Sequence, residues 1–154
     1  MRGKQATKRI INGDAKFSRV DIAKFINRIM ERGKKTTAQQ IVYGAFDLIS
    51  QKTKRDALEV YDQALRNVGP SLELKGRRIG GANYQVPVVV MGDRKTVLAQ
   101  NWLIAAARAK KGRPMAQKLA EEIMSAANNE GDAIKKKDDV QKMAEANRAF
   151  AHFA

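Results

Sequence analysis

The sequence predicts a mainly α-helical fold: a six-helix single-domain bundle with a protruding β-hairpin arm between the third and fourth helices. Three observations support this prediction. Apolar residues recur at helical spacing through most of the chain, and capping residues and glycines separate these stretches. Only residues 71–91 alternate with a period of two, as strands do. With 154 residues, 44% of them hydrophobic, the chain is long enough for one domain with a sizeable core.

The first element expected is a basic N-terminal arm over residues 1–16, which show no hydrophobic period. A helix should follow the arm. Ser18 and Asp21 form a capping-box pattern at its start, and Gly33 is expected to end it.

Two further helices are expected before the hairpin. Thr37 with Gln40 should open one of them, and Asp56 with Glu59 should open the next. Gly69-Pro70 should end the third helix, because proline has no N–H to donate to the helical ladder.

The hairpin arm is expected over residues 71–91. Leu72 and Leu74 alternate with Glu73 and Lys75. In the second strand, Asn83, Gln85 and Pro87 alternate with Tyr84, Val86, Val88 and Val90. The Gly80-Gly81 pair permits the positive φ angles of a tight turn. We expect the aliphatic end of this unpartnered ribbon to pack on the helices and the charged tip to project from them.

Three helices are expected after the hairpin. Asp93 should cap the fourth helix, Pro114 suits the first turn of the fifth, and Asp132 or Asp138 should start the sixth. The single tryptophan, Trp102, lies on the fourth helix and is expected in the core rather than on a base-stacking platform.

The charge of the chain indicates its class of partner. Thirty Lys and Arg residues face sixteen Asp and Glu residues, a net charge of +14. The charge is uneven: residues 1–35 carry +8 and residues 108–118 carry +5. This pattern favours a nucleic-acid partner. The alternatives are a basic protein with no fixed partner and a protein-interaction scaffold, which would not need such a charge.

Two groups of basic residues are candidate binding surfaces. The hairpin tip is cationic, and cationic ribbons are used to lie in nucleic-acid grooves. The alternative is a surface hairpin whose charges maintain solubility and block edge pairing. Lys24, Arg28 and Arg32 are expected in one row of the first helix, where like charges are mildly unfavourable until a phosphate backbone binds. The alternative there is a solvated face.

Catalytic, metal and cofactor sites are not expected. The chain has no cysteine and one histidine, His152, so thiolate and multi-histidine metal sites are excluded. Glu121 and Glu122 are helical neighbours that point in different directions, which does not suit paired acid–base work. We therefore expect no cofactor and no small-molecule substrate, with an enzyme of unfamiliar design as the alternative. No apolar run reaches membrane-spanning length, so no membrane partner is expected.

Several motifs resemble those of one family. They are the run RRIGGANYQVP at residues 77–87, GKKT at 33–36, and MAEANRAFAH at 143–152. These motifs follow one another along the chain in the order expected for the family of small-subunit ribosomal protein seven. From about Phe17 to His152, the chain resembles that family. The resemblance implies a helical bundle with a protruding hairpin. The family pattern usually has a proline at the position of Ala15 and an arginine at the position of Asn101, so both positions depart from it.

The resemblance also implies a function. Members of the family bind the head (3′ major) domain of 16S rRNA and help to organise head assembly. They lie near the exit-site tRNA and the mRNA exit path, and they contact neighbouring small-subunit ribosomal proteins. The implied location is the small ribosomal subunit in the cytoplasm, with an organellar ribosome left open.

The charge pattern and the resemblance together predict one rRNA-binding domain over residues 1–154. Its expected RNA-binding residues are Arg2, Lys4, Lys8, Arg9, Lys24, Arg28, Arg32, Lys34, Lys35, Lys75, Arg77, Arg78, Gly80, Gly81, Arg94, Arg108, Lys110, Lys111 and Arg113. The rival function is a DNA-bending architectural protein with a cationic β-arm, in which Ile79 would be the apolar wedge.

Overall fold

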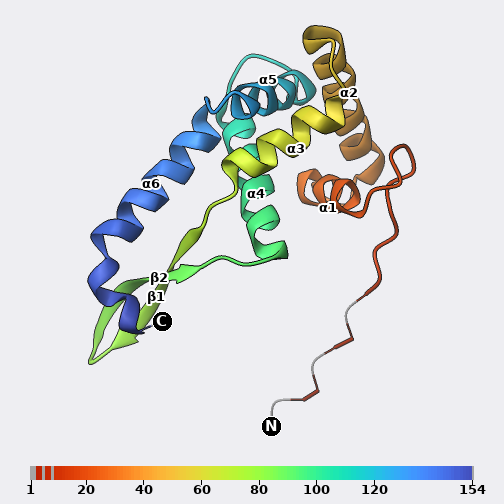
Figure 1. The fold of residues 1–154 in the computed structure, drawn as a ribbon. Helices are drawn as coiled ribbons and strands as arrows, with labels where there is room; N and C mark the ends of the chain where they lie inside the picture. The colour runs from red at the N-terminus through yellow and green to blue at the C-terminus, as the bar shows by residue number, and fades with distance from the viewer. Residues whose placement is uncertain (1–2, 5, 8, 154) are drawn as a thin grey trace. The chain divides into compact units, whose positions relative to one another are not determined.

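The computed structural model describes residues 3–4, 6–7 and 9–153, and it confirms the mainly helical fold with one hairpin (Figure 1). The elements are α1 (Val20–Ile29), α2 (Lys35–Thr53), α3 (Ala57–Val68), β1 (Leu72–Ile79), β2 (Ala82–Val89), α4 (Asp93–Ala109), α5 (Met115–Ala127), α6 (Asp132–Ala146) and the 3₁₀-helix η1 (Arg148–Phe153). The hairpin lies between the third and fourth helices as predicted, whereas η1 was not predicted.

The chain forms two compact units, residues 1–39 and residues 40–154. Each unit has its own internal contacts. That the whole chain behaves as one rRNA-binding domain stays a prediction.

In the first unit, a turn ahead of α1 displaces the predicted helix start. The Asp14 carboxylate accepts hydrogen bonds from the N–H groups of Lys16 and Phe17, at 3.0 and 3.3 Å. The Ser18 N–H donates to the Asp14 carbonyl at 2.8 Å, and Ser18 has φ +55°. Ser18 is therefore part of the turn, and Arg19 occupies the N-cap position without a side-chain cap. The predicted capping box is wrong.

The junction between α1 and α2 also differs from the prediction. α1 ends at Ile29, and α2 begins at Lys35, two residues before Thr37. Between them, Arg32 and Gly33 have φ angles of +52° and +73°. Arg32 is therefore in a turn and not on α1, so the predicted row of three like charges on one helix is wrong.

In the second unit, the helix starts follow the prediction with small shifts. Asp56 caps α3, and its carboxylate accepts the N–H of Leu58 at 3.1 Å. Asp93 is the first residue of α4 and not its cap, because Gly92 with φ +53° occupies the N-cap position. Pro114 is the N-cap of α5 and not in its first turn. Asp132 starts α6, which settles the choice between two candidates.

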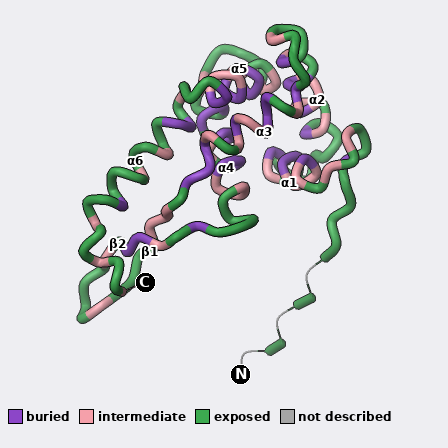
Figure 2. Tube along the Cα trace, viewed as in Figure 1, coloured by how far each residue is buried: buried purple, intermediate pink, exposed green. Residues whose placement is uncertain are grey.

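The core of the second unit combines apolar packing with buried polar groups that are hydrogen-bonded. Its large, fully buried side chains include Val42, Phe46, Ile49, Tyr61, Leu103, Leu119 and Ile123 (Figure 2). Gln100 is also fully buried, and its Nε2 donates to the Tyr61 hydroxyl at 2.8 Å. This bond satisfies two polar groups that would otherwise be costly to bury. Trp102 is only partly buried, in contrast to the expected core position.

The ribbon is a regular two-stranded antiparallel sheet. Its register runs from Leu72 opposite Val89 to Ile79 opposite Ala82. The turn glycines Gly80 and Gly81 have φ angles of +56° and +92°, as predicted. Among the described residues no third strand pairs with the ribbon, as predicted. α6 and η1 lie along it (Figure 1).

Within the described residues, no helix is both long and apolar enough to cross a membrane.

Candidate nucleic-acid interface

A basic corner precedes α2 in the first unit. Arg32, Lys34 and Lys35 are exposed there, and none of them has an ion-pair partner among the residues that the structure describes. The first turn of α2 contains no acidic residue. The free N–H groups at a helix N-terminus carry partial positive charge. The positive charges of Lys34 and Lys35 are therefore unfavourable there until an anion binds. The corner therefore has the charge and the donors for a phosphate.

The other predicted basic residues of the first unit are spread over the arm and α1. Lys4 and Arg9 are exposed, whereas Lys24 and Arg28 are partly buried on α1 and interact within the chain. Arg2 and Lys8 lie outside the described residues.

A hollow in the first unit brings two of the predicted residues together. Arg9, on the arm, and Lys35, at the start of α2, both line a space of about 420 Å³. Its wall also includes Asn12, Asp14 and Asn27, so it is polar as well as basic.

The ribbon tip is the second basic surface. Lys75, Arg77 and Arg78 are exposed. The register places Arg77 opposite Tyr84 and Arg78 opposite Asn83. Because neighbouring strand residues point to opposite faces, the two guanidinium groups lie on opposite faces of the ribbon. Neither arginine has an ion-pair partner within the described part of the chain.

The turn at the end of this ribbon is sterically open. No atom lies within 4 Å of a Cβ built on Gly80 or on Gly81. The glycines are therefore required by the turn's positive φ angles and not by crowding.

The base of the ribbon contains an acid that the sequence analysis did not assign. Glu73 Oε2 lies 2.9 Å from Arg94 Nη2, and Glu73 Oε1 lies 3.4 Å from Lys75 Nζ. Burial raises the pKa of Glu73, but the hydrogen bonds and charges of Arg94 and Lys75 outweigh this effect and hold the pKa below its ordinary value. Two predicted RNA-binding residues are thus brought together by one carboxylate.

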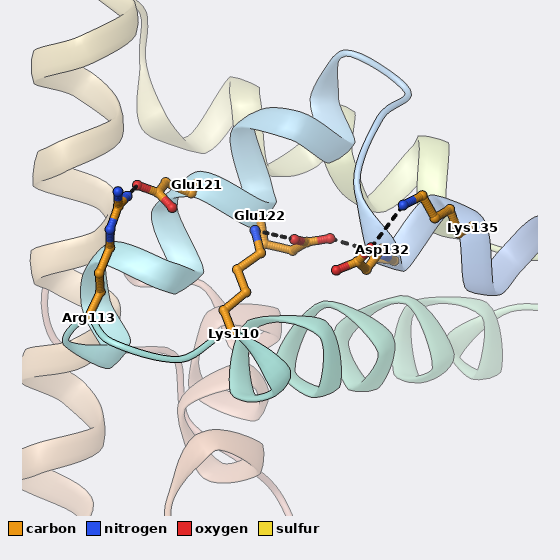
Figure 3. Close-up of polar contacts among 7 residues, drawn as sticks. Lys110, Arg113, Glu121, Glu122, Asp132 and Lys135 are labelled. Carbon is orange, nitrogen blue, oxygen red and sulfur yellow. Dashed lines mark hydrogen bonds and ion pairs between the residues drawn. The ribbon is translucent and has the colours of Figure 1, made fainter.

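The loop between α4 and α5 is the third basic surface, and its cations differ in their surroundings (Figure 3). Lys110 Nζ lies 2.6 Å from Oε2 of Glu122, which is fully buried. Arg113 pairs with Glu121 at the surface. Lys111 is exposed and has no ion-pair partner among the described residues. Arg108 is exposed at the end of α4 and interacts within the chain.

One of the three acidic partners had a signal in the sequence. Glu122 falls on the apolar stripe of α5 that includes Leu119, Ile123 and Ala126, which predicts burial of its carboxylate. Glu73 and Glu121 had no comparable signal in the sequence.

The arrangement suits binding of a polyanion. Among the described residues, no group of three or more His, Asp or Glu side chains could hold a metal ion. The basic residues are grouped at a helix corner, a ribbon tip and a loop, each of which can neutralise phosphates. The narrow ribbon can enter spaces in a folded nucleic acid that a helix cannot.

Comparison with known proteins identifies the family. A family profile described as Ribosomal protein S7p/S5e matches residues 1–148. The chain is 61% identical over 153 residues to the small ribosomal subunit protein uS7 of Thermotoga maritima and 60% identical to that of Thermotoga neapolitana, with 99% of each chain covered. It is 55% identical over 146 residues to the protein of the same name from Chloroflexus aggregans, covering 95% of this chain and 93% of the relative. The chain belongs to the Ribosomal protein S7p/S5e family.

Proposed function

We propose that this chain is a structural protein of the small ribosomal subunit that binds the head (3′ major) domain of 16S rRNA and helps to organise its assembly. The observation that carries the proposal is the family match over residues 1–148, together with relatives named small ribosomal subunit protein uS7 at up to 61% identity. The role is structural and not enzymatic. In the assembled subunit the protein would lie near the exit-site tRNA and the mRNA exit path and would contact neighbouring small-subunit proteins.

The distribution of charge supports RNA as the ligand. The net charge is +14, and exposed cations occupy the α2 corner, the ribbon tip and the loop between α4 and α5. Several separate surfaces allow one protein to hold several RNA helices in a fixed relation. Each neutralised phosphate releases counterions, which supplies affinity and makes it dependent on salt.

Binding to RNA fragments tests the proposal. The purified chain would be titrated with a 3′ major domain fragment of 16S rRNA, and with a 5′ domain fragment of equal length as the control. We expect tighter binding to the 3′ fragment, with an affinity that falls steeply with salt. Equal binding to both fragments would contradict the proposal, and preference for duplex DNA would support the architectural DNA-binding alternative. Sedimentation of the protein with small subunits in a sucrose gradient gives an independent check.

Proximity to tRNA and mRNA needs a separate measurement. The chain has no cysteine, so single cysteines can carry a radical-generating iron chelate. Asn83→Cys would place the probe beside the ribbon tip, and Lys136→Cys would place it on the exposed surface of α6 as a control. In reconstituted subunits we expect cleavage of exit-site tRNA from the tip position and not from the control. Absence of tRNA cleavage from the tip would contradict this part of the proposal.

A further inference from the structure

Glu122 is a buried acid that connects three helices. Its side chain extends from α5 and is 0% exposed. Oε1 accepts the backbone N–H of Ala133, in the first turn of α6, at 2.9 Å. Oε2 lies 2.6 Å from Nζ of Lys110, which reaches across from the end of α4 (Figure 3). One carboxylate therefore satisfies an N–H at the start of α6 and holds a cation at the end of α4.

The chain that leads into α6 passes close to this carboxylate. Gly131 precedes α6 with φ +96°, and a Cβ built there would lie 2.8 Å from Oε1 of Glu122 and 3.2 Å from Cβ of Ser125. The chain thus passes close to the carboxylate, at a position where an added Cβ would force Glu122 or the chain to shift.

The contact between Lys110 and Glu122 stabilises the fold. Oε2 of Glu122 is buried, and among the described residues its partner is the ammonium of Lys110. Lys110 is 31% exposed, so the buried member of the pair is Glu122. Removing the cation leaves the buried carboxylate uncompensated, which is destabilising. Drawing Lys110 away to a phosphate would have the same effect.

The two other cations of this loop are held much less firmly. Lys111 has no ion-pair partner among the residues described. Arg113 pairs with Glu121, but the two side chains are 60% and 29% exposed. An exposed pair of this kind contributes little to stability, so its arginine can be transferred to a phosphate at small cost.

We propose that Glu122 divides the basic loop between α4 and α5 into an inner and an outer part. Lys110 is a structural cation that stays on Glu122 in the complex, whereas Lys111 and Arg113 are the cations that neutralise RNA phosphates. This inference rests on the proposed function and revises the sequence-based prediction that all three residues bind RNA.

Three variants test the division by melting temperature and by the salt dependence of RNA affinity. Lys111→Met should leave melting unchanged and reduce the slope of log affinity against log salt by about 0.7–0.9, one phosphate's share. Lys110→Met should lower the melting temperature by roughly 5 °C or more. Lys110→Met with Glu122→Gln removes both charges and keeps an acceptor for the Ala133 N–H, so it should recover most of the melting temperature. Its slope should match that of the native chain.

The outcomes separate this inference from the proposed function. The inference would be wrong if the folded variant Lys110→Met with Glu122→Gln lost as much of the salt slope as Lys111→Met does. That result would show that Lys110 contacts a phosphate. An unchanged slope in Lys111→Met would overturn the assignment of the outer cations. If the native chain itself shows no salt-dependent binding to the 16S fragment, the proposed function fails, and this inference fails with it.

Discussion

The ring of Tyr84 in β2 packs against the ring of Phe150 in η1, with centroids 5.0 Å apart and planes inclined at 49°. Phe153 adds a second contact, with its ring centroid 6.3 Å from that of Tyr84. Tilted aromatic pairs at these distances are favourable beyond their buried area. Because Tyr84 lies opposite Arg77 in the register, the aromatic contact supports the ribbon close to its cationic tip.

This contact predicts that Phe150→Ala loosens the ribbon while the helices stay folded. The partly buried ring should contribute about 1–2 kcal/mol, below the values for fully buried aromatics. We expect faster amide hydrogen exchange in β1 and β2 and unchanged exchange in α3 and α5. Phe150→Leu retains apolar volume and should lie between the native chain and the alanine variant. Unchanged exchange in the strands would show that η1 does not support them.

The opposite orientations of Arg77 and Arg78 predict independent contributions to RNA binding. Arg77→Ala and Arg78→Ala should each raise the Kd about fivefold, or about 1 kcal/mol, and the double variant should show the sum of the two effects. Stability should change by no more than about 0.5 kcal/mol, because both side chains are exposed. The paired lysine variant should recover only part of the affinity, since lysine lacks the planar fork of donors. Filter binding and thermal melting would measure both effects. Complete rescue by lysine would indicate that bulk charge alone acts at the tip.

Gly131 and Gly112 form a matched pair for testing the packing at Glu122. Both have positive φ angles, +96° and +79°, but a Cβ at Gly112 would meet no atom within 4 Å. Gly112→Ala should therefore cost only the backbone strain, about 1 kcal/mol. Gly131→Ala adds the contact with Glu122 and should cost clearly more. Urea unfolding would give both values, and equal losses would mean that Glu122 moves aside without penalty.

The lowered pKa of Glu73 predicts a pH dependence of stability. Because the pKa is lower in the folded chain than in the unfolded one, the stabilising contribution is present above the unfolded value, near 4.3. It is lost as the pH falls through the folded value. Glu73→Gln should therefore be less stable than the native chain at pH 6, and the difference should shrink towards pH 3. Arg94 is 54% exposed, so the difference at pH 6 should stay below about 1 kcal/mol. Urea unfolding at pH 6, 4 and 3 checks this, and a difference that grows in acid would contradict it.

The sequence predicts helices well where the signal is local. The Asp56 cap and the Gly80-Gly81 turn depend on residues within a few positions of each other, and both were predicted. The start of α1 was missed because Asp14, before the expected cap, binds the backbone of the turn. A pattern of capping residues cannot show whether Asp14 or Ser18 accepts the backbone N–H groups that follow it.

The site was harder to predict because its details depend on contacts between elements. Clusters of Lys and Arg are visible in a sequence, but their acidic partners are not. Lys110 and Lys111 are neighbours with the same charge, yet only the folded chain brings Lys110 to Glu122. The predicted residues at the ribbon tip are exposed as expected, whereas Arg94 shares Glu73 with Lys75. Their individual roles in binding RNA stay predictions.

The contact between Tyr84 and Phe150 has a kinetic consequence. The strands β1 and β2 are joined by a two-residue turn, so their pairing can form within about 1–10 μs of the chain being free to move. The support from η1 requires closure over a stretch that contains α4, α5 and α6, and contacts that are distant in sequence form slowly. The strands can therefore pair before the aromatic rings of Tyr84 and Phe150 meet.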